Sequence, residues 1–215
     1  MKRFAPLFLV ALLALVAAQA GATNLLINGS FQDNDFTGWN LGTTADGTAG
    51  QGFPIVTGWP LGGMNAAKYE VGQVNSNGLF EGATLSQTFN TSGGMATLSF
   101  DWLAMGDGIH TNAEGGLFEL VLDGNLLASH DVGQIGPNDQ FNGVLTATLN
   151  LSAGQHTFEI EILRNFLSNP GNTPYQYITG ADVEGQSGVP EPGTLMLLGS
   201  GVVGMAGILR RKLNF

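Results

Sequence analysis

The clearest structural signal in the sequence is the alternating stretch Thr157-Phe158-Glu159-Ile160-Glu161-Ile162. Successive side chains of a β-strand point to opposite faces, so the three apolar residues share one face and the two carboxylates share the other. Similar short apolar segments recur between turns rich in Gly, Asn and Asp, and helical periodicity is absent between residues 23 and 188. We therefore expect an all-β fold, an antiparallel sandwich or barrel.

Working outward from this stretch, we expect strands at residues 25–27, 66–71, 84–89, 96–103, 117–122, 126–130, 144–151, 156–163 and 175–183. Asp123-Gly124-Asn125 is expected to close a hairpin, because Asp and Gly tolerate the positive φ of a tight turn. Ser152-Ala153-Gly154-Gln155 is expected to separate the next pair of strands in the same way. Residues 41–63 are rich in Gly, Ser and Thr and predict loops at one end of the fold, where binding sites tend to lie.

Charge is distributed unevenly along the 215 residues, which contain 33 glycines, no cysteine and 11% charged residues. The formal net charge is −10, but between residues 23 and 188 only Lys68 and Arg164 are basic, against 16 acidic residues, which gives this body −14. Such a body repels phosphate backbones, so the composition argues against nucleic acid as a partner. Divalent cations and neutral polymers such as sugars are compatible partners. The glycine content also argues against a helix-rich enzyme.

The first 22 residues have the layout of a secretory signal peptide. Lys2 and Arg3 form the basic region, residues 7–18 form the apolar core, and Ala18-Gln19-Ala20 or Ala20-Gly21-Ala22 provides the small-residue cleavage site. An uncleaved N-terminal anchor is the alternative. Export would permit disulfides, so a domain without cysteine must be held together by core burial or by a metal.

Residues 189–215 have the layout of a sorting signal, joined to the body by a short linker at residues 185–188. Pro190, Glu191 and Pro192 precede an apolar stretch at residues 194–209, and the basic residues that follow are Arg210, Arg211 and Lys212. Sixteen helical residues rise about 24 Å, slightly less than a bilayer core of about 30 Å. We expect a transmembrane helix at residues 194–209, stopped by the basic cluster, which stays cytoplasmic.

This tail resembles the PEP-CTERM sorting signal of Gram-negative bacteria that make exopolysaccharide. The resemblance implies that Pro190, Glu191 and Pro192 are the recognition motif for exosortase, the membrane enzyme that processes such tails. It further implies use of the export machinery, a transient stay in the inner membrane through the C-terminal helix, and then a place at the cell surface or in the extracellular matrix. A plain tail anchor without processing is the alternative.

The body, residues 23–184, resembles galactose-binding-like jelly-roll domains, a group that includes many carbohydrate-binding modules. The opening Asn24-Leu25-Leu26-Ile27-Asn28-Gly29-Ser30-Phe31 and the later Gly38-Trp39 carry the resemblance. Further pieces follow in order, namely Leu98-Ser99-Phe100-Asp101-Trp102, Leu122-Asp123-Gly124, Leu151-Ser152-Ala153-Gly154-Gln155-His156-Thr157-Phe158 and Ala181-Asp182-Val183. The fold it implies is an antiparallel β-sandwich, and it leaves the ligand open.

The same resemblance implies a structural calcium site that joins the first loop to the last strand. Asp182 is the residue carried over from the last strand, and Asp33 and Asp35 are the carboxylates that the first loop supplies. Gln32 stands where an acidic residue often follows the phenylalanine, which removes one charged ligand. The alternative is that these acids are solvated loop residues.

Aromatic side chains are the candidates for stacking on sugar rings: Trp39, Trp59, Trp102, Tyr69, Tyr175 and Tyr177. Trp102 lies in a strongly apolar strand and is expected in the core. Trp39, in the opening segment, is expected to be structural. Trp59 follows Thr57-Gly58 in the loop-rich stretch and is the best ligand candidate, with core packing left open as its alternative.

Signs of catalysis are weak. Glu159 and Glu161 lie about 7 Å apart on one strand face, loosely within the range of inverting glycosidases, but alternating carboxylates are also the ordinary solvent face of a strand. His110, His130 and His156 lack metal-ligand spacing. We therefore expect an exported, non-catalytic cell-surface or matrix protein that could bind polysaccharide. The alternatives are a purely structural or adhesive biofilm-matrix component and, third, a glycan-active hydrolase.

Overall fold

A computed structural model describes residues 23–185 and residue 201 of the chain. Within residues 23–185 all regular elements are β-strands. In chain order they are β1 (Thr23–Asn24), β2 (Asn40–Thr43), β3 (Gly47–Thr48), β4 (Ile55–Gly58), β5 (Asn65–Tyr69), β6 (Gly72–Gln73), β7 (Glu81–Thr91), β8 (Gly94–Met105), β9 (Leu117–Leu122), β10 (Asn125–Asp131), β11 (Gln140–Leu151), β12 (Gly154–Arg164) and β13 (Tyr175–Gly185).

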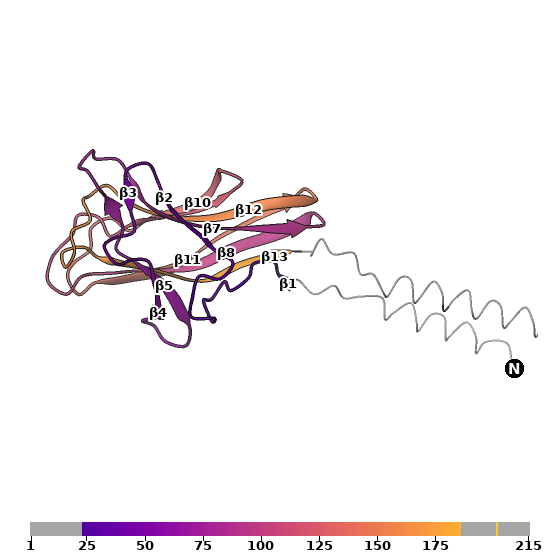
Figure 1. Cartoon of the computed structure of the whole chain (residues 1–215), viewed down its shortest axis with the longest axis horizontal. Helices are drawn as coiled ribbons and strands as arrows, with labels where there is room; N and C mark the ends of the chain where they lie inside the picture. The colour runs from indigo at the N-terminus through magenta and orange to yellow at the C-terminus, as the bar shows by residue number, and fades with distance from the viewer. Residues whose placement is uncertain (1–22, 186–200, 202–215) are drawn as a thin grey trace, which may run out of the picture.

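The long strands form two antiparallel sheets that face each other, as Figure 1 shows. The larger sheet has six strands in the order β11-β8-β13-β5-β4, with β1 paired to β13 outside this path. The smaller sheet has five strands in the order β10-β9-β12-β7-β2, and β3 pairs with β6 in a separate two-stranded ribbon. The expected all-β antiparallel sandwich is confirmed.

The core lies between the two sheets and is built from the inward-facing half of each alternating strand. Phe158, Ile160 and Ile162 of β12 are fully buried, and Ile160 lies opposite Leu120 of β9 and Leu85 of β7. Burying each such side chain contributes about 1.5–3 kcal/mol relative to leaving it exposed. The alternation in the sequence therefore assigns the two faces of β12 correctly.

Two of the three tryptophans belong to this core, as expected. Trp39 is 7% exposed and Trp102 is 4% exposed. The Trp102 ring stacks on Phe118 at 4.9 Å and on His130 at 4.4 Å between ring centroids. Gly143 on β11 leaves the space that this ring needs, since a Cβ there would lie 2.9 Å from Cζ2 of Trp102.

The two predicted turns behave differently. Asp123 and Gly124 both have positive φ, 51° and 74°, and they close the expected β9–β10 hairpin with Leu122 opposite Asn125. The turn after Leu151 instead crosses between the sheets, because β11 pairs with β8 whereas β12 pairs with β7 and β9. The expectation of a second hairpin is thus wrong. A short turn can join strands that pack face to face as readily as strands that pair, and the turn residues alone do not distinguish the two.

The boundaries at the N-terminal side also need correction. Residues 41–63, expected as loops, contain strand residues of β2, β3 and β4. The sequence does not reveal these strands because they are two to four residues long, include no buried residue and lack an alternating pattern. The strand expected at residues 25–27 is replaced by β1 at Thr23–Asn24. The Ile27 amide donates a hydrogen bond to Oε1 of the Gln87 side chain at 2.5 Å, in place of a bond to a neighbouring strand.

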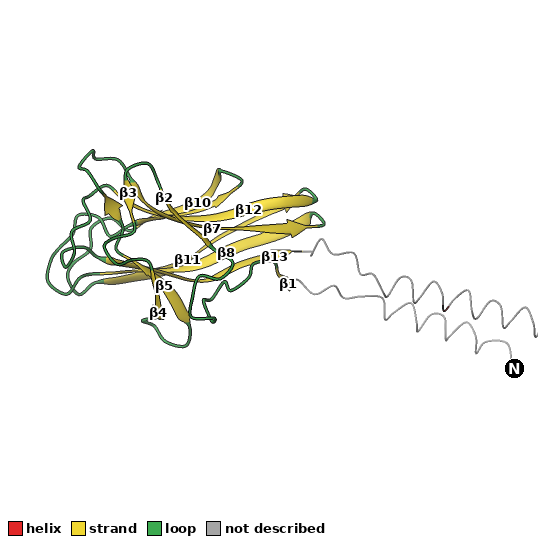
Figure 2. Ribbon diagram, in the orientation of Figure 1, coloured by secondary structure: helices red, strands yellow, loops and turns green. Residues whose placement is uncertain are grey.

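The described chain starts and finishes at the same end of the sandwich, since Thr23 of β1 lies opposite Gly185 of β13. The loops at residues 106–116, 132–139 and 165–174 lie at the opposite end together with the β3–β6 ribbon, as Figure 2 shows in green. We call this the loop end. It is the end that faces away from both connections to the rest of the chain.

Candidate functional site

A group of aromatic side chains surrounds the only lysine of the body on the outer face of the six-stranded sheet. Tyr175 and Tyr177 alternate with the buried Gln176 and Ile178 on β13, so both tyrosines point outward. Lys68 of β5 lies directly opposite Tyr177 in the ladder. Phe53, from the segment before β4, completes the group, which we call the aromatic surface: Phe53, Lys68, Tyr175 and Tyr177.

The Lys68 ammonium group sits among three aromatic rings. Its Nζ lies 3.7 Å from the ring centroid of Tyr175 and 5.6 Å from the centroids of Phe53 and Tyr177. The rings of Phe53 and Tyr175 lie 6.2 Å apart between centroids. Cation–π attraction holds such an ammonium over the ring faces. The arrangement fixes the positions of the rings and keeps a hydrogen-bond donor at the surface.

Electrostatics link Lys68 to the buried Glu70, which directly follows the end of β5. Burial lowers the pKa of Lys68, and the negative charge of Glu70 opposes this shift. Burial also raises the pKa of Glu70, against the hydrogen bond from the Gly171 backbone and the charges of Lys68 and Arg164. The Ser168 hydroxyl donates to the Glu70 carbonyl at 2.7 Å, which ties the β12–β13 loop to this strand.

Trp59 lies beneath the aromatic surface and does not form its exposed part. It is 9% exposed and packs with Ala66, Leu103 and Tyr177, and its ring meets Tyr177 edge-on at 6.4 Å. The proposal that Trp59 offers an open face for ligand stacking is therefore corrected. The β4–β5 hairpin turns this residue back onto the outer face of the sheet, where it covers apolar neighbours.

Tyr177 is largely buried by this packing and is 6% exposed. Burial, with a smaller effect of Tyr175, raises the pKa of Tyr177 to about 12. Its hydroxyl therefore remains protonated at physiological pH. Tyr175 and Phe53 are more open than Tyr177, so these two rings are the ones that a ligand could reach.

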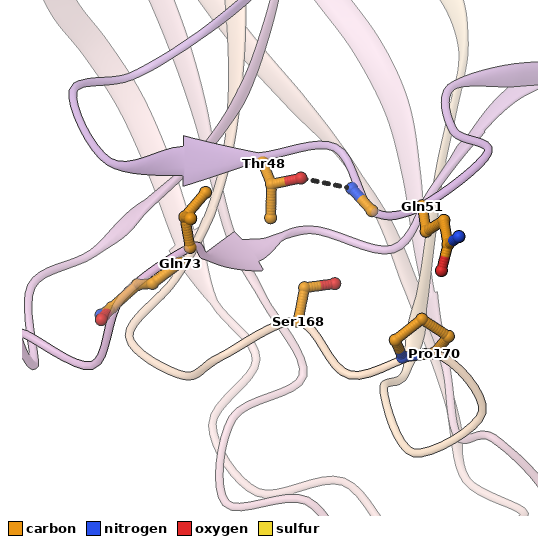
Figure 3. A pocket seen from close by; sticks show the side chains of 7 residues that line it. Thr48, Gln51, Gln73, Ser168 and Pro170 are labelled. Carbon is orange, nitrogen blue, oxygen red and sulfur yellow. Dashed lines mark hydrogen bonds between the residues drawn. The ribbon is translucent and has the colours of Figure 1, made fainter.

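A shallow pocket of about 310 Å³ opens at the loop end (Figure 3). It is lined by Thr48, Gly50, Gln51, Gln73, Val74, Ser168 and Pro170. These side chains carry hydroxyl and amide groups and no formal charge. The Thr48 hydroxyl accepts a hydrogen bond from the Gly50 amide at 3.1 Å, which shapes the rim drawn in Figure 3.

The pocket and the aromatic surface are joined through the chain segment 48–53. Gly50 lines the pocket, and its carbonyl accepts a hydrogen bond from the Phe53 amide at 3.2 Å. A Cβ at Gly50 would lie 2.6 Å from the Glu70 carbonyl and 3.1 Å from the Phe53 ring, so this contact requires glycine. Aromatic rings and uncharged hydrogen-bonding groups thus lie side by side at the loop end.

The two glutamates of β12 lie on the other outer face of the sandwich. Glu161 stands opposite Glu119 of β9 and next to Glu159. Burial, the hydrogen bond with Glu159 and the charges of Glu119 and Glu159 raise the pKa of Glu161 to about 7. The two carboxylates are adjacent along a single strand instead of facing each other across a gap.

The expected calcium ligands are not brought together. Asp33 and Asp35 lie exposed in the first loop, and the Asp35 carboxylate accepts a hydrogen bond from the Thr37 amide at 2.8 Å. Asp182 points away from the core because its neighbours Ala181 and Val183 point into it. Within residues 23–185, no three acidic or histidine side chains are placed to bind a metal ion together. The three expected carboxylates therefore do not form one group, and the calcium site stays a prediction.

The histidines each have a local partner. His110 and Asp107 form a 2.7 Å contact within one turn, and His156 contacts Asp123 at 2.7 Å, which links the β9–β10 turn to the start of β12. The third histidine is the one that stacks on Trp102. The Asp123 hydrogen bond and that of the Ser152 carbonyl raise the pKa of His156.

Sequence reasoning listed both tyrosines of the aromatic surface but missed Lys68 and Phe53. A signal for Lys68 was present, because it is one of two basic residues in a body of 16 acids and lies in an expected strand. Phe53 carried no such signal, since its neighbours in the chain show no strand pattern.

The expected signal peptide, sorting motif and transmembrane segment lie outside the described residues, apart from residue 201. This includes Pro190, Glu191 and Pro192, the basic residues Arg210, Arg211 and Lys212, and most of the linker. No helix in the described part of the chain is both long and apolar enough to cross a membrane.

Comparison with known proteins identifies the C-terminal tail. Residues 188–212 match the PEP-CTERM protein-sorting motif, and a chain with this motif is an exported protein that is anchored in the membrane before processing. No curated protein matches the chain.

Among solved structures, three similar chains illustrate the sandwich. A family 61 carbohydrate-binding module, solved with β-1,4-galactotriose, is 13% identical, with a TM-score of 0.46 over 77% of this chain and 100% of that one. A xylan-binding domain from Paenibacillus barcinonensis is 10% identical, with a TM-score of 0.42 over 80% and 100%. A cleaved adhesin domain of Lys-gingipain from Porphyromonas gingivalis is 10% identical, with a TM-score of 0.46 over 74% and 98%.

Proposed function

We propose that this chain is an exported, non-catalytic protein of the cell surface or extracellular matrix that binds a neutral polysaccharide at the loop end. The observation that carries the proposal is the aromatic surface lying beside an uncharged pocket. Sugar-binding sites combine apolar ring faces with a few placed hydrogen-bonding groups, and both components are present here.

The two parts of the site would act on different parts of a sugar. The rings of Tyr175 and Phe53 offer apolar area to the C–H face of a pyranose, while the Lys68 ammonium can donate to a ring hydroxyl. Thr48, Gln51 and Ser168 offer neutral donors and acceptors to the next sugar along the chain. The body charge of −14 disfavours polyanionic glycans, so a neutral polymer is the favoured ligand class.

The position of the site agrees with a protein that is held by its tail. The described chain ends close to its start, and the loop end lies opposite. A body attached through residues beyond Gly185 would therefore present the aromatic surface and pocket outward.

The non-catalytic part of the proposal is supported by the carboxylates. Glycoside hydrolysis by two carboxyl groups needs them on either side of the scissile bond. Glu159 and Glu161 are neighbours on one strand, on the face of the sandwich that lacks the aromatic surface.

A glycan array and a pull-down with the exopolysaccharide of the host test the binding. We expect binding to neutral polymers by the protein as purified after export. Blank results in both assays would remove the binding function. Release of reducing ends from a bound glycan would contradict the non-catalytic assignment.

For sorting, we propose that exosortase recognises Pro190, Glu191 and Pro192 and that cleavage nearby separates the body from the apolar stretch at residues 194–209. Mass spectrometry of the protein from hosts with and without the processing enzyme tests this step. The expected result is a smaller mature protein only when the enzyme is present. Equal masses would contradict it and would favour a plain tail anchor.

A further inference from the structure

Strand β11 forms an edge of the six-stranded sheet and pairs with another strand on one side only. It pairs with β8 over its full length, from Gln140 opposite Met105 to Leu151 opposite Gly94, and it stands at the end of the sheet order. Among residues 23–185, no hydrogen bond joins the backbone of β11 to a strand other than β8. Half of its amide and carbonyl groups therefore face outward, as in any edge strand.

This edge lacks the features that normally prevent strands from pairing with one another. The 12 residues of β11 include no charged residue and no proline. The other long sheet edge, β10, carries Asp131 and an irregular register between Leu126 and Ala128. The remaining edges, β2 and β4, are only four residues long. Natural proteins protect open edges by charge, bulges or short length, and β11 has none of these.

The side chains of β11 are compatible with pairing to an identical strand. Antiparallel neighbours that lie directly opposite point to the same face of a sheet, so outward residues must meet outward residues. A two-fold axis at Leu145 or at Thr146 satisfies this condition. All outward side chains are uncharged in either case: Gln140, Asn142, Val144, Thr146, Thr148 and Asn150. Neither register sets like charges against each other.

We propose that β11 pairs antiparallel with β11 of a second copy of this chain, which joins the two six-stranded sheets into one continuous sheet. Charge favours this edge as the meeting place. Two bodies of −14 repel each other over most of their surfaces, and β11 is a long, uncharged line along which they can approach. The outward backbone groups of β11, which otherwise face solvent, would then pair with those of the second copy.

The pairing has a consequence for ligand binding. A two-fold axis perpendicular to the sheet keeps both outer faces on the same side and puts the two loop ends at opposite ends of the joined sheet. One polymer lying along that face would meet both aromatic surfaces. Linked sites gain avidity because the second binding event becomes intramolecular. The dimer itself does not depend on the proposed sugar site, so its test needs no glycan.

Sedimentation of the protein purified after export tests the pairing, with Thr146→Lys as the disrupting variant. Two lysines placed near each other at the centre of the interface should raise the dimer Kd by on the order of tenfold or more. Thr88→Lys is the matched control, because Thr88 is exposed on β7 of the other sheet. We expect a dimer in the parent and the control and a shift toward monomer in Thr146→Lys. A monomer at all concentrations, or a dimer that Thr146→Lys does not weaken, would overturn the proposal.

Cysteine cross-linking gives a second readout that also fixes the arrangement. The chain contains no cysteine, so any disulfide cross-link must form between the introduced cysteines. The double variant Val144→Cys/Thr146→Cys places thiols opposite each other in either register, whereas Ser86→Cys/Thr88→Cys is the control on β7. We expect oxidation to give a covalent dimer of the first variant only. Equal cross-linking of both variants, or none of the first, would refute pairing through β11.

Discussion

Glu161 allows the electrostatics of the five-stranded sheet to be tested by a single substitution. Its pKa is raised from 4.5 to about 7 by burial, by the hydrogen bond with Glu159 and by the charge of Glu119. The folded state therefore holds a proton that the unfolded state releases at lower pH. Stability associated with this group is complete below pH 4.5 and is lost as pH rises through about 7.

The size of the effect follows from the linkage between pKa and stability. A difference between 4.5 and about 7 corresponds to about 3 kcal/mol, at about 1.4 kcal/mol for each pH unit. The carboxyl group is partly exposed, so solvent screening reduces this to about 1–2 kcal/mol. Glu161→Gln removes the ionisation, and we expect the variant to be more stable than the parent by that amount at pH 8 and equally stable at pH 4.

Urea denaturation of the parent and the variant at several pH values measures this difference. Thr88→Val is the control, because Thr88 is exposed on the neighbouring strand β7 and carries no ionisable group. Its stability difference from the parent should be the same at pH 4 and pH 8. If Glu161→Gln is no more stable than the parent at pH 8, or if the gain is the same at both pH values, the account of this carboxylate cluster is wrong.

Three further predictions concern the core, a turn and the expected calcium site. Gly143→Ala should lower the free energy of unfolding by about 1–3 kcal/mol, because its Cβ would lie 2.9 Å from Trp102, while Gly58→Ala, which meets no atom within 4 Å, should be close to neutral in thermal denaturation. His156→Gln should lower the free energy of unfolding by about 0.5–1 kcal/mol at pH 6 and by less at pH 9. The reason is that Asp123 raises the pKa of His156, so the stabilisation by this pair is present below pH 6.5 and is lost as pH rises through the raised pKa. A chelator should leave the melting temperature unchanged; a drop would show that a bound metal stabilises the fold.

The strands that could be predicted from the sequence are those whose two faces differ. β9 was predicted at its observed bounds, and the faces of β12 were assigned correctly. In such strands one face packs on the core and the other faces solvent, so apolar and polar residues alternate in the sequence. β2, β3 and β4 show no such alternation, since they are two to four residues long and include no buried residue. The turn after Leu151 shows a second limit, because local residues do not determine which sheet the next strand joins.

Only part of the candidate site could be predicted from the sequence, because its residues are far apart in the chain. Tyr175 and Tyr177 could be listed from residue type, but their grouping with Lys68 depends on the pairing of β13 with β5, more than a hundred residues apart in the chain. Trp59 was the preferred ligand candidate because it lies in a loop-rich stretch, but it packs into a second apolar cluster, which is the alternative that the sequence left open. Asp33, Asp35 and Asp182 do not form a group of three metal-binding side chains in residues 23–185, and binding of calcium through Asp182 and oxygens of the first loop stays a prediction.

The sorting tail, by contrast, was identified from residue order alone. A linear signal needs its parts in sequence, not in space, and residues 188–212 contain the motif, the apolar stretch and the basic stop in order. This is why the tail could be recognised without a fold, whereas the ligand surface could not.

Hydrogen–deuterium exchange with and without the host polysaccharide tests binding at the loop end, because it reports where a ligand contacts the protein. We expect slower exchange of backbone amides in residues 48–53 and 166–177 when the polymer is present, and unchanged exchange in β12 around Glu159 and Glu161. Tyr175→Ala should raise the polymer concentration needed for this protection by about tenfold. Met95→Ala is the control, because Met95 is an exposed apolar residue at the other end of β8, and it should leave that concentration unchanged. Protection centred on the two glutamates of β12, or no protection at the loop end with a polymer that binds, would contradict this expectation.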